Sequence, residues 1–125
     1  MKTRELKQNE WKNFCGQLGD SQGGGLVTIQ LVQADGSTDP VVADVPLQSV
    51  AFKENPDACN DTIVMEAGLP NERPHKHLIV EPVRLILRNG SGDRFNQLEI
   101  IAESGTTLVT FHPGINPASL DRLSA

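Results

Sequence analysis

The residues that decide the fold are Leu26-Val27-Thr28-Ile29-Gln30-Leu31-Val32, the run LVTIQLV at positions 26–32. Val27, Ile29 and Leu31 alternate with Thr28 and Gln30, so an apolar side chain recurs at every second position. Because successive side chains of a β-strand point to opposite faces, this pattern predicts a strand with one buried face.

The chain that follows this run repeats the pattern in short pieces. Further strands are predicted at 41–45, at 47–52 as a weaker candidate, and at 62–67, 77–88, 98–103 and 106–112. Pro82 interrupts the longest of them, so 77–88 is an edge strand, a bulge, or two strands with a bend. Asp35-Gly36, the Gly-containing stretch 89–94 and Ser104-Gly105 are typical of hairpin turns.

One helix is predicted near the N-terminus. Its apolar stripe has the spacing i, i+3, i+4, i+7 and consists of Trp11, Phe14, Cys15 and Leu18. Asn9 suits the N-cap position, and Gly19 suits a left-handed residue after the last turn. The helix is therefore expected over about 9–18.

These elements predict an α+β domain that is mainly β. Strands alternate with turns rather than with helices, which favours antiparallel hairpins over a parallel sheet. We expect an antiparallel barrel or strongly curled sheet of about six to eight strands, with the single helix packed against it. The length of 125 residues fits one domain over 1–125, with a β region over about 26–112 and an irregular tail over 113–125.

Composition narrows the classes of function. Eleven Lys and Arg face sixteen Asp and Glu, and the net charge of −5 disfavours binding to nucleic acid. No run approaches the roughly 20 apolar residues of a membrane helix, and the first ten residues are polar, so neither a membrane span nor a signal peptide is expected. Cys15 and Cys59 do not make a disulfide framework, which predicts reduced thiols in a cytoplasmic protein.

The main candidate site is His75-Lys76-His77. On a strand, the two imidazoles project from one face, which is the geometry of a His-x-His metal pair. Glu81 has the same parity, and His112 is the third histidine of the chain. Imidazole and carboxylate ligands suit Zn, Fe or Mn. The competing interpretation, which we prefer, is a polar strand start with both histidines solvated.

Two other segments resemble ligand loops only superficially. The run 35–39 places oxygens at alternate positions, as a calcium loop does, but a hairpin turn explains it fully. The glycines at 23–25 and 90–92 precede strands, whereas phosphate-binding loops open a helix. Cys15 lies on the apolar helix stripe and is expected to be an inert, buried thiol.

Arginines gather on the strand that follows Pro82. Val83, Leu85 and Leu87 are predicted to face one way, and Arg84 and Arg88 the other. The two guanidinium groups suit an anionic partner. The commoner use, and our prediction, is pairing with acidic residues of the neighbouring strand, namely Glu99 and Glu103.

The ordered pattern of the whole chain also resembles a known family. The segments that carry the resemblance are Thr3-Arg4-Glu5, Glu10-Trp11 with Phe14, Gly25-Leu26-Val27-Thr28, Val45-Pro46-Leu47 with Val50, Asp61, Ile63, His75, His77, Pro82, Leu98-Glu99-Ile100 and Gly105-Thr106-Thr107-Leu108-Val109. Together they resemble a bacterial family of small uncharacterised proteins, catalogued as a domain of unknown function. The resemblance implies no activity and no cofactor.

A second, partial resemblance concerns the histidines. The run His75-x-His77-x-x-x-Glu81 is similar to the first metal motif of the cupin barrels, which implies a metal held by those three residues. A cupin places another histidine after Pro-x-Gly. Here Pro113-Gly114 has no histidine after it, and His112 precedes the turn instead.

These observations predict a small non-enzymatic module that binds a partner or itself. No catalytic residue and no cofactor loop is recognised in the sequence. A homo-oligomer or an unidentified protein partner fits this interpretation, because a curled sheet leaves an edge to cover. The alternative is a β-barrel that binds a metal or a small ligand through His75, His77 and Glu81.

Overall fold

The computed structural model describes residues 3–21, 25–33, 35–54, 61–69, 71–88, 95–103 and 105–115, and for 19–21 and 113–115 only the backbone. Cys59, the glycines at 23 and 24, and the predicted turn at 89–94 lie outside the described residues. The irregular tail was predicted over 113–125, but the last strand continues to Ile115, and residues 116–125 are not among those described. The elements in chain order are β1 (Thr3–Leu6), the short 3-10 helix η1 (Gln8–Glu10), α1 (Trp11–Ser21), β2 (Leu26–Val32), β3 (Thr38–Lys53), β4 (Thr62–Ala67), β5 (His75–Val80), β6 (Pro82–Arg88), β7 (Phe95–Ala102) and β8 (Gly105–Ile115).

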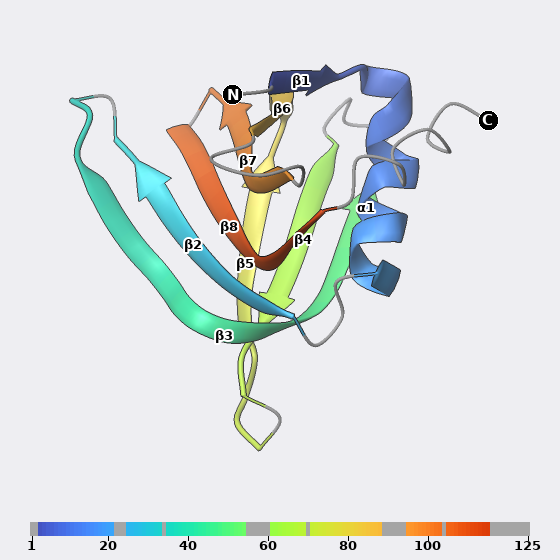
Figure 1. Ribbon diagram of the computed structural model, residues 1–125. Coiled ribbons are helices and arrows are strands. Elements are labelled where there is room, and N and C mark those ends of the chain that lie inside the picture. Colours follow the sequence, from blue (N-terminus) through green and yellow to red (C-terminus); the bar gives the residue numbers. More distant parts are fainter. Residues whose placement is uncertain are drawn as a thin grey trace.

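The eight described strands form one sheet in the order β1-β6-β7-β8-β2-β3-β4-β5, and every neighbouring pair is antiparallel. The predicted mainly β fold is therefore confirmed as a curled sheet rather than a closed barrel. β5 and β6 lie toward opposite ends of this order, yet Glu81 alone separates them in the chain. The two ends of the sheet must therefore come together, which forces the strong curl seen in Figure 1.

The long strand β3 carries much of this curl. Its N-terminal part pairs with β2 up to Pro46, and its C-terminal part pairs with β4 from Leu47 on. Asp44, just before this exchange, has a φ of 50°, which an L-residue adopts in few places. The Asp44 N–H donates to Thr28 Oγ1 at 3.1 Å. The sequence predicted two strands here, at 41–45 and 47–52, but the chain bends through Pro46 without ending the strand.

The core lies inside the curl and is mostly aliphatic. The sheet contributes Val27, Ile29, Leu47, Ile63, Met65, Leu85, Leu87, Leu98, Ile100, Val109 and Phe111, among others. The predicted helix stripe is buried as well, with Trp11, Phe14, Cys15 and Leu18 at most 3% exposed. α1 packs against β3, where Trp11 meets Phe52 edge to face with ring centroids 6.5 Å apart. An isolated helix of this length would not persist in water, so this contact holds it.

The N-terminal segment differs from its prediction. β1 pairs with β6 and was not expected, and α1 spans Trp11–Ser21 rather than about 9–18. Asn9, the predicted N-cap, lies in η1. The buried Glu10 carboxylate instead accepts the Lys7 N–H at 2.9 Å and lies 3.2 Å from Arg4 Nη2. Glu10 thereby joins β1 to the start of the helix.

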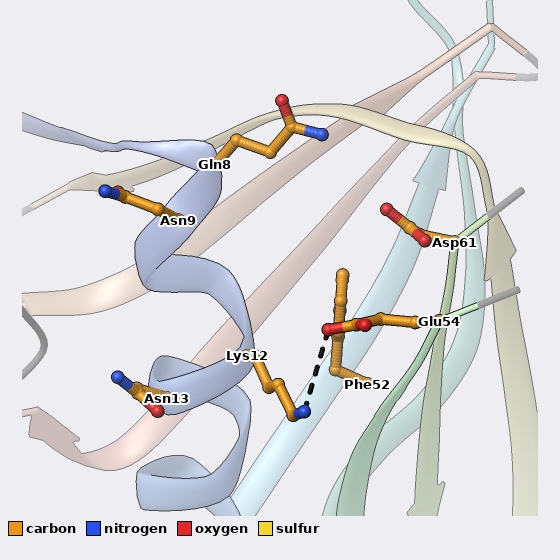
Figure 2. Close-up of a pocket in the computed structure, with 7 residues that line it drawn as sticks. All are labelled: Gln8, Asn9, Lys12, Asn13, Phe52, Glu54 and Asp61. Carbon is orange, nitrogen blue, oxygen red and sulfur yellow. Dashed lines mark ion pairs between the residues drawn. The ribbon is translucent and has the colours of Figure 1, made fainter. Parts of the chain in front are cut away.

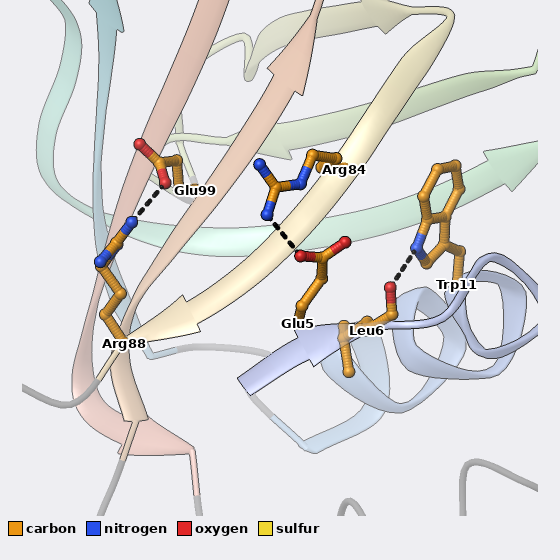
Figure 3. A network of polar contacts seen from close by, with 6 residues as sticks. All are labelled: Glu5, Leu6, Trp11, Arg84, Arg88 and Glu99. Atoms are coloured by element: carbon orange, nitrogen blue, oxygen red, sulfur yellow. Dashed lines mark hydrogen bonds and ion pairs between the residues drawn. The ribbon is translucent and has the colours of Figure 1, made fainter. Parts of the chain in front are cut away.

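Two ion pairs and one buried hydrogen bond fix the outer strands (Figure 3). Arg88 Nη2 lies 2.9 Å from Glu99 Oε1 on β7, as predicted. Arg84 pairs with Glu5 on β1, a partner that the sequence did not indicate. Trp11 Nε1 donates to the Leu6 carbonyl at 3.2 Å, which fastens the end of β1 to α1. Within the described residues, no helix is long and apolar enough to cross a membrane.

Candidate functional site

A cleft of about 540 Å³ lies between the start of the helix and the sheet (Figure 2). The residues that line it are Gln8, Asn9, Lys12, Asn13, Phe52, Glu54 and Asp61. The first four come from η1 and α1. Phe52 comes from β3, and Glu54 and Asp61 are the residues just after β3 and just before β4. The volume falls within the range of roughly 300–1,000 Å³ that small-molecule sites occupy.

Strand pairing sets the sheet side of this cleft. Lys53 and Thr62 form the last pair of the β3–β4 ladder. Glu54 follows Lys53 and Asp61 precedes Thr62, so both acidic residues lie side by side just beyond this end of the ladder. On the helix side, the bond from the Lys7 N–H to Glu10 fixes the first turn that carries Gln8. Both walls of the cleft therefore stand on hydrogen-bonded backbone.

The groups in the cleft are polar, with one aromatic ring. Figure 2 shows Gln8, Glu54 and Asp61 directed toward the space between helix and sheet, with Phe52 between the two walls. Lys12 Nζ lies 3.7 Å from Glu54 Oε1, and both side chains are more than half exposed, at 70% and 56%. Such an exposed pair contributes little to stability and can open for a ligand.

A second hollow of about 190 Å³ adjoins the cleft. It shares Gln8 and Asp61 with the cleft, and its other lining residues are Glu81, Pro82, Val83 and Glu103. The Glu81 N–H donates to the Asp61 carbonyl at 2.8 Å, which holds the β5–β6 junction beside the start of β4. Across the two hollows, four carboxylates face the single ammonium of Lys12, so this surface disfavours anions.

The two histidines of the predicted metal pair share one face of β5. Both are an even number of residues from the buried Ile79, so they lie on the same side of the strand as Ile79, and His77 is half-buried. His77 Nε2 lies 3.2 Å from Thr107 Oγ1 on β8, so the imidazole reaches across the inside of the curl. Burial, and then the charge of His75, lowers the pKa of His77 below its usual value. A neutral imidazole is the form that binds a metal.

The other two predicted ligands lie elsewhere. Glu81 follows β5 with a φ of 54° and lines the acidic hollow. His112 is exposed on β8 and alternates with the buried Phe111. In the part of the chain that the structure describes, no group of three or more His, Cys, Asp or Glu residues is arranged to hold a metal ion. The structure brings His75 and His77 together without the other two, and the metal site stays a prediction.

Comparison with known proteins identifies the domain. The sequence model of a protein family, described as a family of unknown function (DUF5335), matches residues 2–121 of the chain. The chain belongs to this family. The match includes the cleft, the acidic hollow and both histidines, and it agrees with the resemblance noted from the sequence. No curated protein and no solved structure gave a match.

The residues of the cleft in this DUF5335 domain were not recognised as a site from the sequence. Gln8, Lys12, Glu54 and Asp61 are polar residues in unrelated surroundings, and only the pairing of β3 with β4 and the docking of α1 bring them together. One feature of the sequence could have indicated part of the site. Glu54 and Asp61 lie on either side of the polar stretch between two predicted strands, so the ends of a hairpin would bring them close together.

Two further candidates, Cys15 and the run 35–39, agree with their simpler interpretations. Cys15 is buried, and burial raises the pKa of its thiol to about 12. The N–H and Oγ of Ser37 both donate to Asp35 Oδ1, at 2.9 and 2.7 Å, and these bonds lower the pKa of Asp35. That is the hydrogen bonding of a turn between β2 and β3.

Proposed function

We propose that this domain is a non-enzymatic binding module and that its ligand occupies the cleft between α1 and the β3–β4 ladder. The observation that carries the proposal is the convergence of an amide, two carboxylates, an ammonium and an aromatic ring on one cleft of about 540 Å³. None of its seven lining residues is Ser, Cys or His, so the cleft lacks the pairing of a hydroxyl or thiol nucleophile with an imidazole base. The two reduced thiols predicted from the sequence support a cytoplasmic location.

The lining defines the class of ligand. Gln8 both donates and accepts hydrogen bonds, while the Glu54 and Asp61 carboxylates accept them. Phe52 offers an apolar face. A small ligand with hydroxyl or ammonium groups and one flat apolar side, such as a sugar or an organic amine, matches these groups. Phosphates and nucleotides do not, because carboxylates outnumber the lysine.

An NMR titration tests the proposal. The labelled protein is titrated with glucose, N-acetylglucosamine, benzylamine, inorganic phosphate and a nucleotide. We expect a sugar or the amine to shift the amide signals of Gln8, Lys12, Glu54 and Asp61, and the two phosphate compounds to leave them unchanged. Asp61→Asn keeps one oxygen acceptor but removes the charge, and it should weaken binding about tenfold, because a hydrogen bond to a charged group contributes about 1.4 kcal/mol more than one to a neutral group.

The matched control is Glu72→Gln, which removes an exposed carboxylate in the β4–β5 turn. It should leave the dissociation constant unchanged. Signals that do not move in the cleft with any sugar or amine would contradict the proposal. So would equal weakening by Glu72→Gln and Asp61→Asn, because the effect would then be one of overall charge.

A second candidate function is metal binding through β5. The observation that favours it is the shared face of His75 and His77, which are close enough for the charge of one to lower the pKa of the other. Zn²⁺ titration with elemental analysis tests it. Stoichiometric metal that is lost in the His75→Ala, His77→Ala double variant would favour this function. Metal-free protein whose stability is unchanged in chelator would favour the cleft instead.

A further inference from the structure

The strand β5 lies at one end of the sheet order, and β4 is its only paired neighbour in the described part of the chain. The direction of its backbone groups follows from one bond, in which the Glu81 N–H donates toward β4, to the Asp61 carbonyl. Because these groups alternate along an antiparallel strand, those of His77 and Ile79 also face β4. The N–H and C=O groups of Lys76, Leu78 and Val80 therefore face the open edge.

The side chains of these same residues form an exposed row with apolar members. Lys76, Leu78 and Val80 point away from the core, and Leu78 and Val80 are 54% and 49% exposed. Val83, just beyond Glu81, is 53% exposed. An edge strand with open hydrogen-bonding groups and exposed aliphatic side chains is a surface for pairing with another strand.

We propose that a second copy of this chain pairs with β5 in antiparallel orientation, about a two-fold axis at Leu78. In this register Leu78 faces Leu78 of the second copy, and Lys76 faces Val80 of the second copy. All six open-edge groups of each strand then form hydrogen bonds across the axis. The two sheets become one continuous sheet through the dimer.

Two prolines select this register. Pro74 and Pro82 bracket β5, and proline has no backbone N–H to donate. Shifting the second strand by two residues in one direction places Val80 opposite Pro74, and in the other direction places Lys76 opposite Pro82. In each shifted ladder the carbonyl that faces a proline has no N–H to accept from. In the ladder centred on Leu78, every open-edge N–H and C=O group of Lys76, Leu78 and Val80 has a partner.

Charge favours the antiparallel orientation with an identical strand. In this register Glu81 of one copy lies opposite His75 of the other, so a carboxylate faces an imidazole at both ends of the ladder. A parallel arrangement would align Lys76 with Lys76. The strand has six residues, or about 20 Å, so the interface is small and we expect a weak dimer that forms at high concentration.

Sedimentation of the whole chain from about 1 µM to about 1 mM tests the dimer. The expected result is a mass that rises from that of one chain toward that of two. Leu78→Glu, which changes an exposed side chain, should remain monomeric throughout. The matched control is Leu69→Glu, which is exposed at 47% but lies outside β5 and should dimerise as the wild type does.

Cysteine crosslinking tests the register and does not depend on how Leu78→Glu folds. In Cys59→Ser protein oxidised mildly with copper phenanthroline, Leu78→Cys should form a disulfide-linked dimer, because facing Cα atoms of a hydrogen-bonded antiparallel pair lie about 5.5 Å apart. Val80→Cys should crosslink only when mixed with Lys76→Cys. Wild-type protein that stays monomeric at about 1 mM overturns the proposal, as does a Leu78→Glu dimer of wild-type strength. Self-crosslinking of Val80→Cys without Leu78→Cys overturns the register.

Discussion

The buried carboxylate of Glu10 gives the sharpest test of how the N-terminus is held. Glu10 is 6% exposed, accepts the Lys7 N–H at 2.9 Å and pairs with Arg4 at 3.2 Å. Glu10→Ala removes both interactions and leaves the Arg4 guanidinium without its carboxylate. Glu10→Gln keeps an acceptor for Lys7 and removes only the charge.

The size of the effect follows from these two contacts. A hydrogen bond to a charged group contributes about 1.5–3 kcal/mol when the acceptor is buried. The Arg4 side chain is 35% exposed, so solvent screens its share and we count it near the lower end. Glu10→Ala should therefore lower the free energy of unfolding by about 2–4 kcal/mol, and Glu10→Gln by about 1–2 kcal/mol.

Urea unfolding followed by fluorescence measures this directly, because Trp11 is the single tryptophan of the chain and is buried next to Glu10. With a slope of about 1–3 kcal/mol per molar urea, Glu10→Ala should lower the midpoint by about 1–2 M. The matched control is Glu5→Gln, which removes an exposed carboxylate that pairs with Arg84 and should leave the midpoint unchanged. The reasoning fails if Glu10→Ala costs no more than Glu5→Gln, or if Glu10→Ala and Arg4→Ala show no coupling in a double-mutant cycle.

Three further predictions concern the core and its titratable groups. Met65→Ala should destabilise the fold by about 2–5 kcal/mol in urea unfolding, because Met65 is fully buried and its loss leaves a cavity. In Cys59→Ser protein, the Cys15 thiol, with its pKa raised by burial to about 12, should react with a disulfide reagent at about pH 8 only as the protein unfolds. The folded-state pKa of His77 is lowered from 6.5, so unfolded chains take up its proton first as the pH falls. The free energy of unfolding should therefore decrease as the pH falls below 6.5. Thermal unfolding midpoints measured across this pH range should fall less steeply for His77→Gln than for the wild type.

The regular strands and the helix stripe were predictable because burial of one face leaves a period in the sequence. β2 begins and ends where the alternation of residues 26–32 does. Leu98, Ile100 and Ala102 alternate in the sequence and are buried in β7. The four members of the helix stripe are all buried in α1.

Other features depend on pairings that local sequence does not encode. β1 has one buried residue among four, Leu6, which is too few to show a period. Val83 was expected to lie on the face of Leu85 and Leu87, but the register shift between Pro82 and Arg84 leaves it 53% exposed. The cleft likewise required the docking of α1 against β3.

The junction at Glu81 sets the tolerance of the domain to change in length. Glu81 alone joins β5, the last strand of the sheet order, to β6, the second strand from the other end, so the separation of these two strands at the junction is limited to what one residue can span. Residues inserted at Glu81 would let β5 and β6 separate. The β4–β5 turn is exposed and can accept inserted residues. Peptide tags and split-protein fragments are therefore best inserted in the β4–β5 turn and not at Glu81.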